Sequence, residues 1–375
     1  MKKKLTAAAL AAGLLLLTGC AAQTVTPFTA YWQQNTSVYD RSFYETLHYS
    51  VSFDRSENFR SGFIFEPGEG CSYTVTTEAV PAWNGRSQLY RLTSSLTLEG
   101  SYIYVDPDTN EESEIVAFGG ESGNEPAVIE RTVLFCSPFG DNLEPVRSES
   151  TVYSYTPVEQ DSREVAVYSY SYSVSYTEDG DEASVTYTDH FAGLTEAEST
   201  INENTRKVSV FAEEILPEGE VSVSGIQSRY TGIDEAQLLF AGRGLSYSSG
   251  SALPLTVFSG GSAYTVSMSG TAASVSCAGE TSFVLDGERM EDGAVEAVIV
   301  SARLAHGGTD TGPLQTAVYA LPAQTDADGN AQGNLYFALP LEVRQAFGFA
   351  GTAAEIVYSL EEASHALPAA ATDGE

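Results

Sequence analysis

Basic residues are scarce in this chain. Its 375 residues contain 18 Lys and Arg against 51 Asp and Glu, so the formal net charge is −33. Beyond the first four positions the chain has one lysine, Lys207. Nucleic-acid binding depends on Lys and Arg that release counterions from phosphates, so this composition excludes a nucleic-acid partner. The acidity also opposes contact with anionic lipid headgroups. The acidic residues can serve solubility alone. Alternatively, they attract cations or a basic partner.

Motifs for common catalytic and metal chemistry are also missing. The sequence has no Gly-x-Ser-x-Gly elbow, no Cys-x-x-Cys pair and no two histidines at metal-binding helical spacing. Asn204 stands three positions before Lys207, so a Ser-x-x-Lys pair is absent. We therefore expect no enzymatic activity and no cofactor. A hydrolase whose site residues are dispersed along the chain is an alternative, because serines and acids are abundant.

The chain has only four cysteines. Cys20 belongs to the N-terminal motif described below, which leaves Cys71, Cys136 and Cys277. Three cysteines allow at most one disulfide. We expect Cys71 to pair with Cys136, because both lie in the N-terminal half; three free buried thiols are the alternative.

The first twenty residues have the pattern of a secretory signal. Three lysines at positions 2–4 precede an uncharged run from Leu5 to Leu17, which is too short to span a bilayer. The run ends in Leu17-Thr18-Gly19-Cys20, which resembles the lipobox of bacterial lipoproteins at every position. The resemblance implies cleavage before Cys20 and a diacylglycerol with acyl chains such as palmitate on its thiol. It also implies a protein anchored in the bilayer through Cys20, on the extracytoplasmic face of a bacterial membrane.

The remaining 356 residues suffice for one large all-β domain or two ordinary ones. We divide the chain into a signal peptide (1–19), a lipidated tether (20–40), an antiparallel β domain (41–232), a helix plus β region (233–367) and a disordered tail (368–375).

Alternation of apolar and polar residues with period 2 dominates the chain after the tether. It is clearest in 43–53, 90–98 and 165–177, and it predicts half-buried antiparallel strands. Asp179-Gly180 predicts a hairpin between the last of these and 183–190. Shorter strands are expected near 71–78, 129–136, 149–156, 206–212, 255–259, 263–269, 272–278, 281–285, 294–305, 314–321, 333–339 and 354–360. The segments 104–126 and 137–148 are rich in Pro, Gly and acids and are expected to be loops.

Few helices are expected. Thr195-x-x-Glu198 fits a capping box. In 233–241, Asp234 and Gln237 can cap a helix that Gly242 ends. A further short helix is expected after Pro340. The predicted fold class is mainly β: a long curved antiparallel sheet, as a half-barrel or sandwich, with one or two short helices and a smaller C-terminal β region.

Tyrosines form the most prominent candidate binding surface. Tyr168, Tyr170, Tyr172 and Tyr176 share one face of the strand 165–177, opposite serines. Such rings can line a groove for acyl chains or sugars. They can also be the packed side of the sheet, because tyrosine is a strong strand former.

An acidic segment gives a weak calcium candidate. Asp326, Asp328 and Asn330 place oxygen donors at alternate positions, as at the start of a calcium loop. Ala331 and Phe337 replace the Gly and Glu of that pattern, and a polar hairpin tip explains the same residues. We therefore expect no metal site.

The order of elements is similar to the half-barrel fold of LolA-like bacterial lipid-carrier lipoproteins. Long alternating strands precede a helix with Asp234, Leu239 and Arg243, and short Gly-punctuated strands follow it. The resemblance concerns the order and length of the segments between 40 and 305, and it assigns no site residue. It implies a curved sheet that holds acyl chains against a covering helix.

These observations lead to one main functional hypothesis. The chain is expected to be a lipid-anchored, non-catalytic protein that binds an apolar or amphiphilic ligand, or a protein partner, on a curved aromatic sheet face. A surface-interaction or glycan-binding β module is the alternative, beside the hydrolase named above. The sequence leaves the oligomeric state open.

Overall fold

A computed structural model describes residues 43–55, 62–80, 89–136, 143–157, 163–177, 182–190, 220–224, 231–243, 252–259, 262–277, 279–291, 293–304, 313–320, 324–325, 331–332, 338–349 and 352–365. The elements in chain order are β1 (Tyr44–Arg55), β2 (Gly62–Pro67), β3 (Ser72–Val80), β4 (Leu89–Leu98), β5 (Gly100–Val105), β6 (Glu112–Phe118), β7 (Ala127–Cys136), β8 (Pro145–Pro157), β9 (Val165–Tyr176), β10 (Glu182–Asp189), β11 (Glu220–Ser224), β12 (Thr231–Asp234), η2 (Glu235–Gln237), α3 (Leu238–Gly242), β13 (Ala252–Ser259), β14 (Ser262–Ser276), η3 (Gly279–Thr281), β15 (Phe283–Leu285), β16 (Glu288–Met290), β17 (Ala294–Leu304), β18 (Gln315–Ala320), β19 (Gln324–Thr325), β20 (Ala331–Gln332), β21 (Pro340–Phe349) and β22 (Thr352–Ser364).

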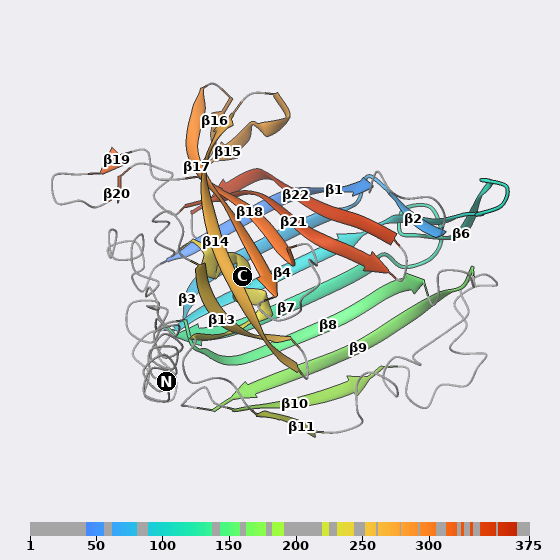
Figure 1. The fold of residues 1–375 in the computed structure, drawn as a ribbon, viewed down its shortest axis with the longest axis horizontal. Helices are drawn as coiled ribbons and strands as arrows, with labels where there is room; N and C mark the ends of the chain where they lie inside the picture. The colour runs from blue at the N-terminus through green and yellow to red at the C-terminus, as the bar shows by residue number, and fades with distance from the viewer. Residues whose placement is uncertain are drawn as a thin grey trace, which may run out of the picture.

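Within the described ranges, one sheet of seventeen strands contains most of the residues. Its long run of neighbours is β11, β10, β9, β8, β7, β4, β3, β1, β22, β21, β18, β17, β14, β13 and β12 (Figure 1). Every pair in this run is antiparallel except β12 with β13. β15 pairs in parallel with β22 and carries β16. The prediction of a mainly β protein with a long curved antiparallel sheet is confirmed.

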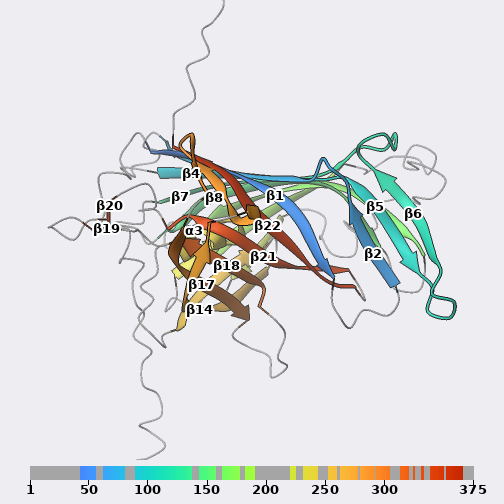
Figure 2. The ribbon, with the colours of Figure 1, turned by 90° about the horizontal axis from the view of Figure 1, so that it is seen from above.

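The sheet bends into an arch. Figure 2 shows β1, β4, β7 and β8 as a long layer, with β14, β17, β18 and β21 beneath one end and β2, β5 and β6 at the other. Right-handed strand twist bends any long sheet, and bulges increase the twist locally. The register shifts at His48/Tyr49 in β1, Leu134/Phe135 in β7 and Val318/Tyr319 in β18. We call the side of the sheet that carries the buried core the inner face.

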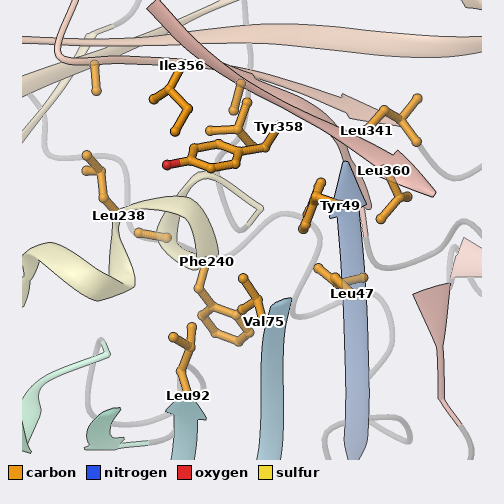
Figure 3. Close-up of a cluster of buried hydrophobic side chains, with 14 of the residues drawn as sticks. Leu47, Tyr49, Val75, Leu92, Leu238, Phe240, Leu341, Ile356, Tyr358 and Leu360 are labelled. Atoms are coloured by element: carbon orange, nitrogen blue, oxygen red, sulfur yellow. The ribbon is translucent and has the colours of Figure 1, made fainter. Parts of the chain in front are cut away.

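The helical turn of η2 and α3 packs on this inner face. Asp234 and Gln237 form the predicted capping box, which is confirmed. Figure 3 shows Leu238 and Phe240 of α3 among apolar side chains of β1, β3, β4 and β22. The Tyr319 hydroxyl donates to the Leu239 carbonyl at 2.7 Å, and the Gln237 amide donates to the Leu143 carbonyl at 2.9 Å. These contacts fix the turn inside the arch.

A buried cluster of charged side chains joins the end of α3 to β1 and β22. Arg243 contacts both carboxylate oxygens of Glu45, at 2.5 and 2.8 Å, and the two side chains are only 2% and 1% exposed. His365 lies between Glu45 and Asp286, at 3.1 Å from each. Burial opposes ionisation of Glu45, yet Arg243 and His365 lower its pKa to about 2. The cluster therefore stays paired well below neutral pH.

Three expectations for secondary structure were wrong. The expected loop 104–126 contains the end of β5 and all of β6, which form a small separate sheet with β2. Alternate residues of these strands are buried: Tyr102, Tyr104, Val116 and Phe118. Burial of these side chains stabilises strands here, although acids and glycines flank them. β8 begins at Pro145, inside the expected loop 137–148. The expected helix after Pro340 is strand β21, whose alternate residues Leu341 and Val343 are buried.

The expected Cys71–Cys136 disulfide is also wrong. All three cysteines after Cys20 are free thiols. Cys71 contacts the backbone of Glu99, with its Sγ 3.1 Å from the Glu99 carbonyl oxygen. Cys136 and Cys277 are buried.

Several expectations concern residues outside the described ranges. These are the signal peptide, Cys20 and its tether, Thr195-x-x-Glu198, the strand 206–212, most of 333–339, the calcium candidates Asp326, Asp328 and Asn330, and the tail 368–375. Within the described ranges, no helix has both the length and the apolar character needed to cross a membrane.

Candidate binding site on the inner face

Strand register places one arginine near the middle of the inner face. Arg131 of β7 lies opposite Ser94 of β4 on one side and Ser150 of β8 on the other. Ser150 lies opposite Tyr172 of β9, which in turn lies opposite Tyr187 of β10. Since residues directly opposite one another share a face of the sheet, these side chains form one row.

Two tyrosines lie beside the serines that flank this arginine. Burial raises the pKa of both hydroxyls, and Ser94 beside Tyr73 and Ser150 beside Tyr172 oppose this rise. Arg131 therefore stands between two Tyr–Ser pairs that are contributed by β3, β4, β8 and β9.

The guanidinium of Arg131 is incompletely paired. Its Nη1 lies 3.6 Å from Oε2 of Glu235 in η2, and the two side chains are 33% and 34% exposed. Its Nε is buried without a hydrogen-bond partner. Burial opposes the charge, yet Glu235 and the neighbouring tyrosines raise the pKa of Arg131 further above its usual range. A permanent positive charge with unused donor capacity thus faces the half-open part of the inner face.

Tyrosine rings form a half-exposed surface beside Arg131. Tyr170 and Tyr172 stack with ring centres 6.5 Å apart and planes 18° apart. Tyr187 packs on Tyr172 at 5.8 Å. Burial raises the pKa of Tyr170 to about 12, with a further contribution from Tyr172. Burial also raises the pKa of Tyr172, so the phenols of Tyr170 and Tyr172 are protonated at neutral pH and can donate as well as accept hydrogen bonds. We call Tyr73, Arg131, Tyr170, Tyr172 and Glu235 the polar end of the inner face.

The two other predicted tyrosines have different surroundings. The ring of Tyr176 packs on Phe258 of β13 at 5.1 Å, and its hydroxyl donates to Oδ2 of Asp234 at 2.6 Å. Burial raises the pKa of Asp234, although the Tyr176 hydrogen bond opposes this. Because Asp234 also caps η2, this contact holds the helical turn against β9. Tyr168 is half-buried opposite Ser154 of β8.

Phenylalanines gather further along the inner face. Phe53 of β1 contacts Phe347 of β21 at 4.7 Å and Phe65 of β2 at 4.8 Å. All three rings are half-buried. Phe53 stands six residues beyond Leu47, which lies in the same cross-strand row as Arg131. At 3.3 Å per residue, this places the cluster roughly 20 Å from that row. We call Phe53, Phe65 and Phe347 the aromatic end.

The space directly beneath α3 is nearly filled. A pocket there is bordered by Leu47, Val75, Leu92, Leu239 and Phe240, among other residues. It has room for about one water molecule. This pocket therefore has no room for a ligand larger than water.

The described residues offer no group of three or more His, Cys, Asp or Glu side chains that can hold a metal ion.

Sequence reasoning singled out Tyr170 and Tyr172 but missed Tyr73, Arg131, Tyr187 and Glu235. One signal was present in the sequence. Arg131 occupies an apolar position in the alternation of Ile129, Val133 and Phe135.

Comparisons with known proteins give a single fold-level likeness. The chain matches no family model and no curated protein. Among solved structures, it is similar to a β-barrel-like protein of domain of unknown function DUF1849 from Brucella abortus. The two chains are 9% identical with a TM-score of 0.44, and the match covers 87% of this chain and 99% of that one. At this level the likeness carries no inference about function.

Proposed function

We propose that this protein is a lipid-anchored, non-catalytic binding protein on the extracytoplasmic face of a bacterial membrane, attached through Cys20. Its ligand is amphiphilic and lies along the inner face. The apolar part of the ligand packs on the aromatic end, and its polar group meets the polar end.

The observation that supports this function is the separation of two chemistries on one sheet face. Half-buried phenylalanines lie at one end, and a charged pair with tyrosine hydroxyls lies at the other. Their separation along β1 is roughly 20 Å. One acyl chain spans half of a hydrocarbon core about 30 Å thick, or about 15 Å. A single-chain amphiphile therefore has the length to contact both ends.

The N-terminal motif supports the proposed location. Leu17-Thr18-Gly19-Cys20 follows a basic and then apolar segment, and two acyl chains hold a protein on a membrane stably. The net charge of the whole chain is −33 and becomes more negative without the lysines at positions 2–4, so the protein has no electrostatic attraction to anionic lipids. In this proposal the anchor alone keeps the inner face close to a source of amphiphiles.

A glycan-binding module is the second candidate. The stacked pair Tyr170–Tyr172 beside the incompletely paired Arg131 favours it, because flat aromatic faces and polar donors both suit sugar rings. The two candidates differ in their need for an apolar chain, since only an amphiphile uses the aromatic end.

Calorimetric titration of the chain starting at Ala21, which retains every described residue, tests the proposal. Dodecyl maltoside below its micellar concentration is expected to bind the unaltered chain, and Phe65→Ala is expected to weaken binding about tenfold. Leu304→Ala is the matched control, because Leu304 is an exposed apolar residue of β17. Equal weakening by both variants, or no binding by the unaltered chain, would contradict the proposal.

A further inference from the structure

We propose that the polar end selects an uncharged saccharide group. This proposal deepens the proposed function and rests on it for the position of the site, because the saccharide would be the headgroup of the amphiphile. A free glycan offers the same chemistry, and the experiment below separates the two sources.

Charge balance argues against an anionic or cationic group. Arg131 and Glu235 carry opposite charges 3.6 Å apart, and both are about one-third exposed. The pair therefore presents little net charge to a ligand. The whole chain has a net charge of −33, which repels anions at distances up to about the Debye length. A cationic ligand would be repelled by the guanidinium of Arg131 at the centre of the site.

Hydrogen-bonding capacity favours a polyhydroxylated group. The Arg131–Glu235 contact of 3.6 Å is longer than a hydrogen bond, and about one-third of the Arg131 side chain is exposed. Nη1 of Arg131 can therefore donate to a ligand oxygen, whereas the unpartnered Nε is buried. The Glu235 carboxylate already accepts from Ser259 and has further acceptor capacity. A sugar hydroxyl is both donor and acceptor, so adjacent hydroxyls can satisfy both groups together.

The aromatic surface beside this pair suits a ring with an apolar side. The ring planes of Tyr170 and Tyr172 are nearly parallel, 18° apart, and both residues are half-buried. A pyranose has faces of C–H groups and an edge of hydroxyls. Its face can pack on a tyrosine ring while its edge reaches Arg131 and Glu235. An acyl chain alone would offer no hydrogen bond to either of those two polar side chains.

Calorimetry with amphiphiles of one chain length tests this selection. The probes are dodecyl maltoside, dodecyl sulfate and free maltose, each below its micellar concentration where one exists. The chain from Ala21 is expected to bind dodecyl maltoside at least tenfold more tightly than dodecyl sulfate. Arg131→Gln is expected to lower maltoside affinity about tenfold. Arg147→Gln is the matched control, because Arg147 pairs with Glu149 at an exposed position.

Each result has a distinct meaning. If dodecyl sulfate binds as tightly as the maltoside, the saccharide proposal is overturned and amphiphile binding stands. If free maltose binds as tightly as dodecyl maltoside, the saccharide site stands and the amphiphile function fails. If none of the three probes binds, both fail. Arg131→Lys serves where the Gln variant does not fold, because it keeps the charge but loses the planar donor fork. Unchanged maltoside affinity in that variant would overturn the role of Arg131.

Discussion

Glu45 provides a quantitative test of how the helical turn is held inside the arch. Its side chain is 1% exposed and contacts Arg243 and His365. Glu45→Gln removes the carboxylate that the buried guanidinium of Arg243 contacts. Breaking a buried pair in this way costs about 3–5 kcal/mol. At pH 7 the variant is therefore expected to be less stable by that amount.

The pH dependence of this difference follows from the pKa of Glu45. The folded value is about 2 against an unfolded value of 4.5, so the carboxylate contributes about 3 kcal/mol above pH 4.5. This contribution falls as the pH drops from 4.5 towards 2. About 2 kcal/mol of it is lost by pH 3. The stability gap between the unaltered chain and Glu45→Gln should narrow by that amount.

Urea unfolding followed by circular dichroism at pH 7 and pH 3 measures the gap. Comparing the two proteins at each pH cancels the titration of the other carboxylates. A gap that is equal at the two pH values would refute the assigned pKa. A gap below about 1 kcal/mol at pH 7 would refute the buried pair as a structural clamp.

Three further predictions concern other parts of the chain. Burial lowers the pKa of His365, but Glu45 and Asp286 outweigh this effect and raise the pKa. The protonated ring therefore stabilises the fold fully below about pH 6.5, and this stabilisation is lost at higher pH. His365→Gln should lower the free energy of unfolding in urea more at pH 5.5 than at pH 9, and an equal loss at both would contradict this. Gly242→Ala places a methyl carbon 2.3 Å from Oη of Tyr319, so it should cost about 1–3 kcal/mol in urea unfolding, and less in a Tyr319→Phe background. Cys20→Ala should abolish incorporation of a radioactive fatty acid, since only the thiol can form the thioether; undiminished label would refute the lipobox assignment.

Local sequence pattern predicted much of the fold. Alternation in 43–53, 90–98 and 165–177 corresponds to β1, β4 and β9. In β1 and β4 one face lies in the core, whereas the tyrosines and serines of 168–173 in β9 are all half-buried. The cap at Asp234 was predictable because its partner Gln237 is only three residues away. β5 and β6 were missed because their buried rings alternate only briefly between acidic and glycine-rich turns.

The candidate site was only partly predictable. Tyr170 and Tyr172 lie on one strand, so their shared face can be read from the sequence. Arg131, Tyr73 and Glu235 reach them through the register of β3, β4, β7, β8 and β9 and through the position of η2. Register depends on pairing between distant segments and is not encoded within any one of them. A charge at an inward position is the local signal, and both Glu45 and Arg131 show it.

Native mass spectrometry tests the central claim most directly. The chain from Ala21 would be secreted by a bacterium and purified without detergent, then sprayed under non-denaturing conditions. The account predicts an added mass in the range of a single amphiphile, which organic solvent releases and which Phe65→Ala reduces. A bare polypeptide mass that stays unchanged after incubation with dodecyl maltoside would contradict the account.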